Sequence, residues 1–298
     1  MLPPTERPAR LAVGVVSAGR VGAVLAAALS RAGHRVEAIA AVSRASLQRA
    51  SRLVPSARIR PADEVAAAAE LLLLAVPDDA LVDLVNGLAS SGAVRRGTLV
   101  AHTSGAHGIT LLDPLTEIGA LPLALHPVMT FTGTDVDLAR LEGACFGVTA
   151  TDQLRPVAEA LVIEMGAEPV WIAESLRPTY HAGLAFGANN LVTLVAEAGD
   201  LLMRAGVENP QRLLGPLLGA ALDNSLRNGD RALTGPVARG DAGTVAAHLR
   251  AIGTQAPEAI SAYVEMSRLT AVRALAAGTL SAERAEALLD VLAHREQS

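Results

Sequence analysis

The chain of 298 residues contains no lysine, because all 25 of its basic residues are arginine. Chemistry that needs a lysine amine, such as a Schiff base or a lysine general acid, is therefore excluded. The single cysteine, Cys145, excludes a disulfide framework and a cysteine-rich metal site. Phe, Trp and Tyr together supply only 2% of the residues, so aromatic platforms for stacked nucleic-acid bases are not expected.

Positive charge is outweighed by negative charge, since the formal net charge is −5 and the isoelectric point is about 5.8. Nucleic acids and anionic membranes attract basic surfaces, so we expect neither as a partner. No apolar run reaches the roughly 18 residues of a membrane span, and residues 1–10 lack the apolar centre of a signal peptide. The sequence therefore predicts a cytoplasmic protein, and its hydrophobic content of 51% predicts a folded core.

The first half of the chain alternates short apolar runs with helical patterns, which is typical of βαβ units and a mostly parallel sheet. The run Leu71–Val76 is apolar throughout, as a strand buried on both faces should be. The predicted strands are Leu11–Val16, Arg35–Val42, Leu71–Val76, Thr98–His102, Ala120–His126, Cys145–Thr149 and Glu168–Ile172.

After Trp171 the sequence shows only amphipathic helical patterns. We therefore predict a flexible tail over residues 1–10, a doubly wound α/β domain over residues 11–174 and an all-α domain over residues 175–298. The predicted helices of the second domain are Pro178–Ala205, Pro210–Arg227, Ala242–Ala251, Pro257–Ala276 and Ala282–His294.

The first predicted strand runs into a glycine turn and then a helix, which is the arrangement of a dinucleotide-binding loop. The fingerprint Gly-x-Gly-x-x-Gly is met by Gly19 and Gly22, whereas Ser17 stands at its first position. Gly19 would let the backbone approach a pyrophosphate, and Gly22 would allow the helix to pack closely on the strand. A merely tight turn is the alternative. The predicted cofactor contacts of this loop are Ser17, Ala18, Gly19, Arg20, Val21 and Gly22.

The second strand ends without the acidic residue that usually binds the ribose hydroxyls of NAD. Ser43 and Arg44 stand there instead, and a hydroxyl followed by a guanidinium suits a 2′-phosphate. The sequence therefore favours NADP(H) over NAD(H). The alternative is that Arg44 simply begins a solvated helix.

Several motifs in a fixed order resemble a known family over nearly the whole chain from Leu11. The chain looks like the Rossmann-like proteins with a C-terminal domain of unknown function. These are relatives of deazaflavin-dependent NADP oxidoreductase, pyrroline-5-carboxylate reductase, ketopantoate reductase and prephenate dehydrogenase. The resemblance implies a Rossmann fold followed by a helical domain like the C-terminal domain of 6-phosphogluconate dehydrogenase. The motifs are Gly14–Gly22, Ala75–Asp79, His102–Ala106, Leu125–Phe131, Tyr180–Ala182 and Gly235–Asp241.

Ligands of an open α/β sheet bind beyond the carboxyl ends of the strands, where three of these motifs fall. Val76 and Pro77 are expected to pass near the cofactor ribose. Ser104 is either a hydrogen-bond donor to the nicotinamide or substrate, or a turn serine. His126 is either catalytic, as the His-Pro of the similar prephenate dehydrogenases implies, or a loop histidine bonded to backbone. His102, on a strand, is expected to be a packed histidine.

The first helix of the second domain opens with Arg177 and His181, which share a helix face because they are four residues apart. Relatives among the β-hydroxyacid dehydrogenases carry a catalytic lysine at a comparable position. Arg177 would clamp a substrate carboxylate and His181 would donate the proton, since imidazole titrates near neutrality. The alternative is a structural arginine and a buried histidine. Asn189 would orient the nicotinamide or another part of the substrate, or simply pack in its helix.

Two classes of function remain open. The first is an NADP(H)-dependent oxidoreductase that acts by hydride transfer on a C=O or C=N group of a small anionic carboxylate, such as a 2-oxo acid or a cyclic imine. The second is an inactive NADP(H)-binding sensor or interaction protein, which the missing lysine suggests. No metal site is predicted, because the histidines lack ligand spacing. Apolar stretches such as Leu213–Leu218 and Ala285–Leu292 predict a homodimer through the C-terminal helices.

Overall fold

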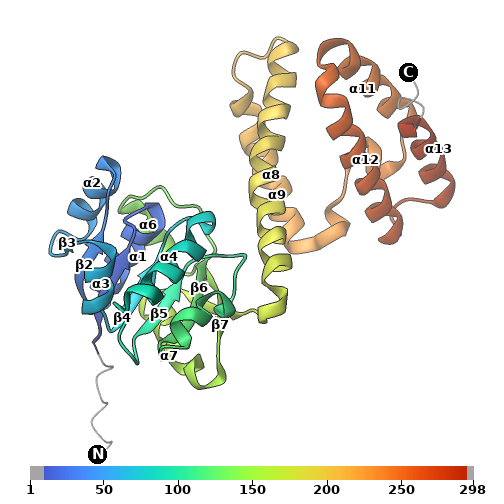
Figure 1. The fold of residues 1–298 in the computed structure, drawn as a ribbon. Coiled ribbons are helices and arrows are strands. Elements are labelled where there is room, and N and C mark those ends of the chain that lie inside the picture. The colour runs from blue at the N-terminus through green and yellow to red at the C-terminus, as the bar shows by residue number, and fades with distance from the viewer. Residues whose placement is uncertain (1–9, 294–298) are drawn as a thin grey trace, which may run out of the picture. The chain divides into compact units, whose positions relative to one another are not determined.

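The computed structural model of the chain describes residues 10–293 (Figure 1). It divides into two compact units, Met1–Phe186 and Gly187–Ser298. The predicted flexible tail, residues 1–10, lies outside the described residues except for Arg10, which forms an ion pair with Glu164. No helix in the described part of the chain is long and apolar enough to cross a membrane.

The first unit is built on one sheet of eight strands in the order β3-β2-β1-β4-β5-β6-β7-β8. All neighbouring strands are parallel except β6 and β7, which are antiparallel. This confirms the predicted doubly wound α/β fold. The strands are β1 (Ala12–Val16), β2 (Arg35–Ala40), β3 (Arg58–Ile59), β4 (Leu71–Leu74), β5 (Leu99–His102), β6 (Leu121–Pro127), β7 (Cys145–Ala150) and β8 (Glu168–Trp171).

The central strands are buried on both faces, which explains their unbroken apolar sequence. In β4, Leu71 and Leu73 belong to one hydrophobic cluster and Leu72 and Leu74 belong to a second. The alternation follows from the two-residue period of a strand. The helices that cover the sheet are α1 (Arg20–Arg31), α2 (Arg44–Leu53), α3 (Ala62–Ala68), α4 (Asp78–Ser91), α5 (Asp113–Thr116), α6 (Val136–Leu141) and α7 (Arg155–Glu164).

In the residues up to 293 that the structure describes, only helices follow β8, as predicted. The long helix α8 begins in the first unit and continues in the second. The core of the second unit joins residues of α10, α11, α12 and α13, among them Val245, Val264 and Leu288. These helices are α8 (Arg177–Arg204), α9 (Pro210–Asn228), α10 (Gly235–Arg239), α11 (Ala242–Gln255), α12 (Ile260–Ala276) and α13 (Ala282–Ala293).

The long helices α8 and α9 bury little of their surface, although both lie wholly within the described residues. Arg177 is the only buried residue of the 28 in α8. Pro210 and Leu214 are the only buried residues of the 19 in α9. Large apolar side chains are exposed on both helices, including Val192 and Leu226. A helix that is apolar on several sides is normally covered by other protein.

Candidate functional site

The turn between β1 and α1 combines an unusual backbone conformation with close packing of the helix on the turn. Ser17 has a φ of +82°, a left-handed conformation that is uncommon for a residue other than glycine. This explains why glycine is usual at this position of the fingerprint. A Cβ on Gly22 would overlap the carbonyl oxygen of Ser17, so α1 approaches the turn as closely as a glycine permits.

Gly19 differs from Gly22, because the surrounding protein does not require a glycine there. A Cβ on residue 19 would lie 3.5 Å from Oγ of Ser17 and 3.9 Å from the carbonyl oxygen of Ala75, both ordinary contacts. The backbone conformation of Gly19, with φ −61°, also suits any residue. The bare backbone at Gly19 thus leaves room at the start of α1, where helix amides attract phosphate groups.

A cavity of about 680 Å³ opens beside this turn, at the carboxyl ends of β1 and β2. Nε of Arg49 donates a hydrogen bond to the carbonyl oxygen of Ala18 at 3.1 Å and so ties α2 to the turn. Arg49 and Arg60 are the charged lining residues, and none of the lining residues is acidic. The cavity is lined by Val16, Ser17, Ala18, Gly19, Ala40, Ala41, Val42, Ser43, Ser46, Arg49, Ile59, Arg60, Pro61, Ala62 and Val76.

Ser43 and Arg44, predicted together as a phosphate contact, are placed differently. Ser43 lines the cavity and caps α2, because its Oγ accepts a hydrogen bond from the amide of Ser46 at 3.1 Å. Arg44 is exposed and is not among the lining residues. Val76 lines the cavity, whereas Pro77 precedes the first turn of α4.

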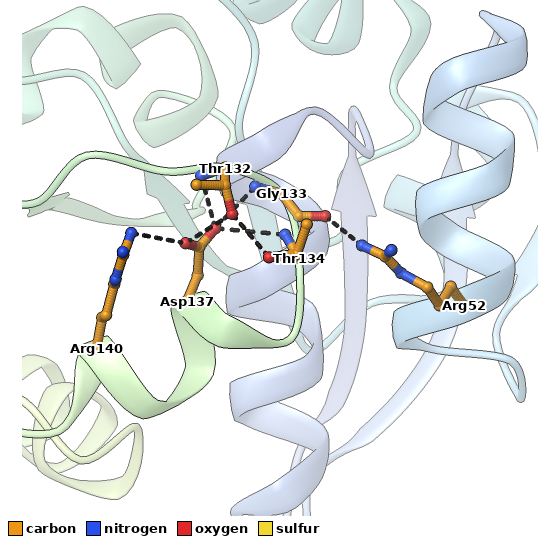
Figure 2. A network of polar contacts seen from close by, with 6 residues as sticks. All are labelled: Arg52, Thr132, Gly133, Thr134, Asp137 and Arg140. Atoms are coloured by element: carbon orange, nitrogen blue, oxygen red, sulfur yellow. Dashed lines mark hydrogen bonds and ion pairs between the residues drawn. The ribbon is translucent and has the colours of Figure 1, made fainter. Parts of the chain in front are cut away.

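A buried carboxylate holds the loop that follows β6 (Figure 2). Asp137 accepts hydrogen bonds from the amides of Thr132 at 2.8 Å and Gly133 at 2.7 Å. Burial alone would raise the pKa of Asp137, but these hydrogen bonds together hold it below its usual range. The carbonyl oxygen of Gly133 in turn accepts a hydrogen bond from Arg52 on α2 at 2.9 Å. The loop therefore fastens to the same helix that contacts the glycine turn.

At the end of β5, His102 and Ser104 are internal. His102 is fully buried, and its Nε2 lies 2.8 Å from the carbonyl oxygen of Gly108. Burial lowers the pKa of His102 to about 4, so the ring is neutral at pH 7. Oγ of Ser104 accepts a hydrogen bond from the amide of His107. His102 is thus the packed histidine that the sequence predicts, and Ser104 has the geometry of a turn serine.

The prediction that Arg177 clamps a substrate carboxylate is wrong, because its guanidinium is buried and already bonded within the protein. The residue has 0% of its surface exposed. Its side chain donates to Oγ1 of Thr149 and to the carbonyl oxygens of Ser104, Ala124 and Gly147, at 2.9–3.1 Å. These acceptors come from β6, β7 and the segment after β5. Arg177 therefore joins the start of α8 to the sheet, and a substrate carboxylate would have to displace these partners to reach it.

His126 and His181 come together beside Gly105. Their ring centroids are 5.9 Å apart with an interplanar angle of 84°. A Cβ on residue 105 would lie 2.6 Å from Cδ2 of His181 and 3.0 Å from Nε2 of His126, so a glycine is needed there. Both histidines are half-buried, and both belong to the first unit rather than to opposite domains as the sequence suggested. The predicted pair of candidate proton donors thus shares one site.

The environment of His126 disfavours its charged form. Burial, then His181 and Arg177, lowers the pKa of His126 to about 4, against a smaller opposing effect of Asp78. Nδ1 of His126 lies 2.8 Å from the hydroxyl of Tyr180. His126 is therefore a neutral imidazole at pH 7 and not a cationic acid.

Two family comparisons cover most of the chain. Residues 3–127 match the Rossmann-like domain, and residues 144–270 match a domain of unknown function, DUF2520. The protein is a Rossmann-like domain followed by a DUF2520 domain. A search among curated proteins found no match.

Solved structures share the fold of this Rossmann-like, DUF2520-containing chain. A candidate NADP oxidoreductase from Bacteroides fragilis is 22% identical with a TM-score of 0.73, and the match covers 88% of this chain and 98% of that one. A protein from Thermotoga maritima is 19% identical with a TM-score of 0.65, covering 89% and 98%. A reductive aminase from Aspergillus terreus, in complex with NADPH4, cyclohexanone and allyl amine, is 16% identical with a TM-score of 0.57, covering 97% and 94%.

No role for Tyr180 follows from the sequence analysis, although the residue contacts His126 directly. The contact could have been inferred from Gly147, because a glycine inside a strand often marks a close approach of another group. A Cβ on Gly147 would overlap the hydroxyl of Tyr180. Asn189 was predicted as a site residue, and it is an exposed residue of α8 within the second unit.

Proposed function

We propose that this protein is an NADP(H)-dependent oxidoreductase that reduces a C=O or C=N group of a small carboxylate substrate. The observation that carries the proposal is the cavity of about 680 Å³ beside the glycine turn, with Arg49 and Arg60 in its lining and no acidic residue there. A dinucleotide with an additional phosphate fits this charge pattern, because an acidic residue would bind free ribose hydroxyls instead.

The residues present fit the cofactor in two ways. The space above Gly19 and the amides at the start of α1 suit a pyrophosphate. Ser43, Arg49 and Arg60 line the cavity and would offer a hydroxyl and two guanidinium groups to a 2′-phosphate. When bound, NADPH would supply the hydride, and the protein would supply position and a proton.

The histidine pair provides the remaining chemistry. His181 would protonate the oxygen or nitrogen that receives negative charge as hydride reaches the neighbouring carbon. His126, being neutral, would offer a hydrogen bond to the same atom. No lysine exists to take either role, and Arg177 is engaged with the sheet. Two neighbours support this reading, one described as a candidate NADP oxidoreductase and one as a reductive aminase in complex with NADPH4.

The test is oxidation of NADPH, followed at the nicotinamide absorbance, with a panel of 2-oxo acids, cyclic imines and prephenate. Turnover of one class identifies the reaction. Tight binding of NADPH by calorimetry without turnover of any compound would favour the second candidate, a nucleotide-binding sensor. The observation in favour of that candidate is Arg177, because its burial removes the cation predicted to hold a substrate carboxylate.

We also propose that the protein is a homodimer through α8 and α9. The exposed apolar side chains of these helices include Val192, Leu217 and Leu226. Burial of such side chains contributes about 25 cal/mol for each square ångström removed from water. A second copy of the chain would present the same apolar surface, which is the requirement for a two-fold interface.

A further inference from the structure

The hydroxyl of Tyr180 sits between two groups of the sheet. On one side it lies 2.8 Å from Nδ1 of His126 in β6. On the other it meets the backbone of Gly147 in β7, the residue paired with His126 across the ladder. Burial, the largest effect, raises the pKa of Tyr180, against smaller opposing effects of Arg177 and the Gly147 backbone. The phenol is therefore protonated at pH 7.

The proton of this hydroxyl has one acceptor. Among the described residues the hydroxyl has one hydrogen-bond partner, Nδ1 of His126, because the amide of Gly147 belongs to the ladder between β6 and β7. The opposite arrangement, with Nδ1–H donating to the oxygen, would leave the O–H of a half-buried tyrosine without an acceptor. A polar group left without a partner in this way destabilises the arrangement.

The other nitrogen of His126 is open to a ligand. In the described part of the chain Nε2 accepts or donates no hydrogen bond, and no buried side-chain nitrogen or oxygen there lacks a partner. Nε2 is therefore reachable from solvent. It lies on the side of the ring that faces Gly105, and His181 borders the same residue.

We propose that Tyr180 is a positioning residue that fixes neutral His126 with its proton on Nε2, so that His126 presents a hydrogen-bond donor to the substrate beside His181. Tyr180 acts by donating its hydroxyl proton to Nδ1 of His126. Arg177 supports the arrangement, since its guanidinium carbon lies 5.9 Å from the centre of the Tyr180 ring. The charged and titratable groups around His126 are His181, Arg177, Asp78 and His102.

In this arrangement the two histidines have different chemical roles. The identity of the ligand rests on the proposed function. An N–H donor can stabilise negative charge on a carbonyl oxygen or an imine nitrogen but does not itself have to transfer a proton. The transferred proton would then come from His181. The tautomer of His126, in contrast, is a property of the free protein and can be measured without turnover.

The test is long-range proton–nitrogen correlation NMR of the full chain with ¹⁵N-labelled histidine at pH 7, with the His126 signals assigned from a His126→Gln variant. We expect the Nε2 signal at the position of a protonated nitrogen and the Nδ1 signal at that of an acceptor. In Tyr180→Phe the two signals should move toward each other as the tautomers mix. A wild-type Nδ1–H tautomer, or an unchanged tautomer in Tyr180→Phe, would overturn the proposal.

The second unit offers a matched control. Tyr263 lies 2.8 Å from Nδ1 of His248 in the same edge-to-face arrangement, with ring centroids 6.0 Å apart. Tyr263→Phe should change the signals of His248 and leave those of His126 unchanged. If a substrate is found, Tyr180→Phe should lower kcat roughly tenfold, the equivalent of about one hydrogen bond, without changing KM for NADPH. An unchanged kcat would contradict the positioning role, and failure to find any substrate would instead contradict the proposed function.

Discussion

The carbonyl oxygen of Ser17 occupies the position that a Cβ on Gly22 would need. Gly22→Ala must therefore push α1 away from the turn, and we expect it to destabilise the protein by about 1–3 kcal/mol. Urea unfolding measures the loss. Gly19→Ala is the matched control, because its Cβ has room: stability should stay within about 0.5 kcal/mol while affinity for NADPH falls. Equal losses of stability in both variants would contradict this assignment.

Cofactor choice is expected to depend on Arg60. A charged hydrogen bond to a 2′-phosphate is worth about 1.5–3 kcal/mol, so NADPH should bind about 10- to 100-fold more tightly than NADH. Arg60→Gln should weaken the binding of NADPH and leave the affinity for NADH unchanged, as measured by calorimetric titration. Arg44→Gln is the comparison, since Arg44 is exposed and does not line the cavity. If only Arg44→Gln removes the preference, the interpretation drawn from the sequence is right and the one drawn from the cavity is wrong.

The proton donor is expected to be His181. General acid catalysis contributes roughly 10²–10⁴-fold, so His181→Ala should lower kcat by that order without changing the dissociation constant of NADPH. His126→Ala removes a hydrogen-bond donor and should cost less. The measurement is steady-state kinetics under conditions where hydride transfer, shown by a deuterated cofactor, limits the rate. A His181→Ala enzyme with full kcat would transfer the role to His126.

The free energy of unfolding should decrease as the pH is lowered from 7 to 5. His102 and His126 bind protons near pH 4 in the folded protein but near pH 6.5 when unfolded, so protons in this window favour the unfolded chain. Each histidine should lower the free energy of unfolding by about 2 kcal/mol over that range. Urea unfolding at pH 7, 6 and 5 tests this, and His126→Gln should reduce the slope by about half. The same slope in the variant would show that His126 does not contribute.

The dimer is testable by sedimentation equilibrium at micromolar concentration, where we expect twice the chain mass of 30.5 kDa. Leu217→Asp places a charge on an exposed apolar part of α9 and should yield monomers. Leu47→Asp, at an exposed leucine of α2 in the first unit, is the control and should leave the assembly intact. A wild-type monomer would refute the proposal.

Much of the fold could be predicted from local patterns, because buried parallel strands are continuous apolar runs such as Leu71–Leu74. The strand β3 was missed for the same reason: Arg58 and Ile59 are both exposed, so no apolar pattern marks them. The sequence also singled out His126 and His181, one at a strand end and the other on the helix after the last strand, but it placed them in different domains rather than in one unit.

The role of Arg177 could not be predicted. Helical spacing shows that it shares a face with His181, but not that this end of the face is buried against the sheet. Its acceptors lie 28 to 73 residues away along the chain, and they are Ser104, Ala124, Gly147 and Thr149. Contacts of that kind depend on how the strands are ordered in space. The contact of Tyr180 could not be predicted for the same reason, because its partner His126 is 54 residues away along the chain.

Arg177 also has a consequence for the order in which the protein is made. Every strand of the sheet ends by Trp171, so the ribosome releases all eight strands before it releases the guanidinium that bonds to β6, β7 and the segment after β5. A nascent chain, or a fragment cut after β8, holds a complete set of strands but lacks the guanidinium that bonds to Ser104, Ala124, Gly147 and Thr149. The first unit therefore includes a residue of the helical region, and dividing the gene at the last strand would remove the hydrogen bonds of Arg177 from the sheet.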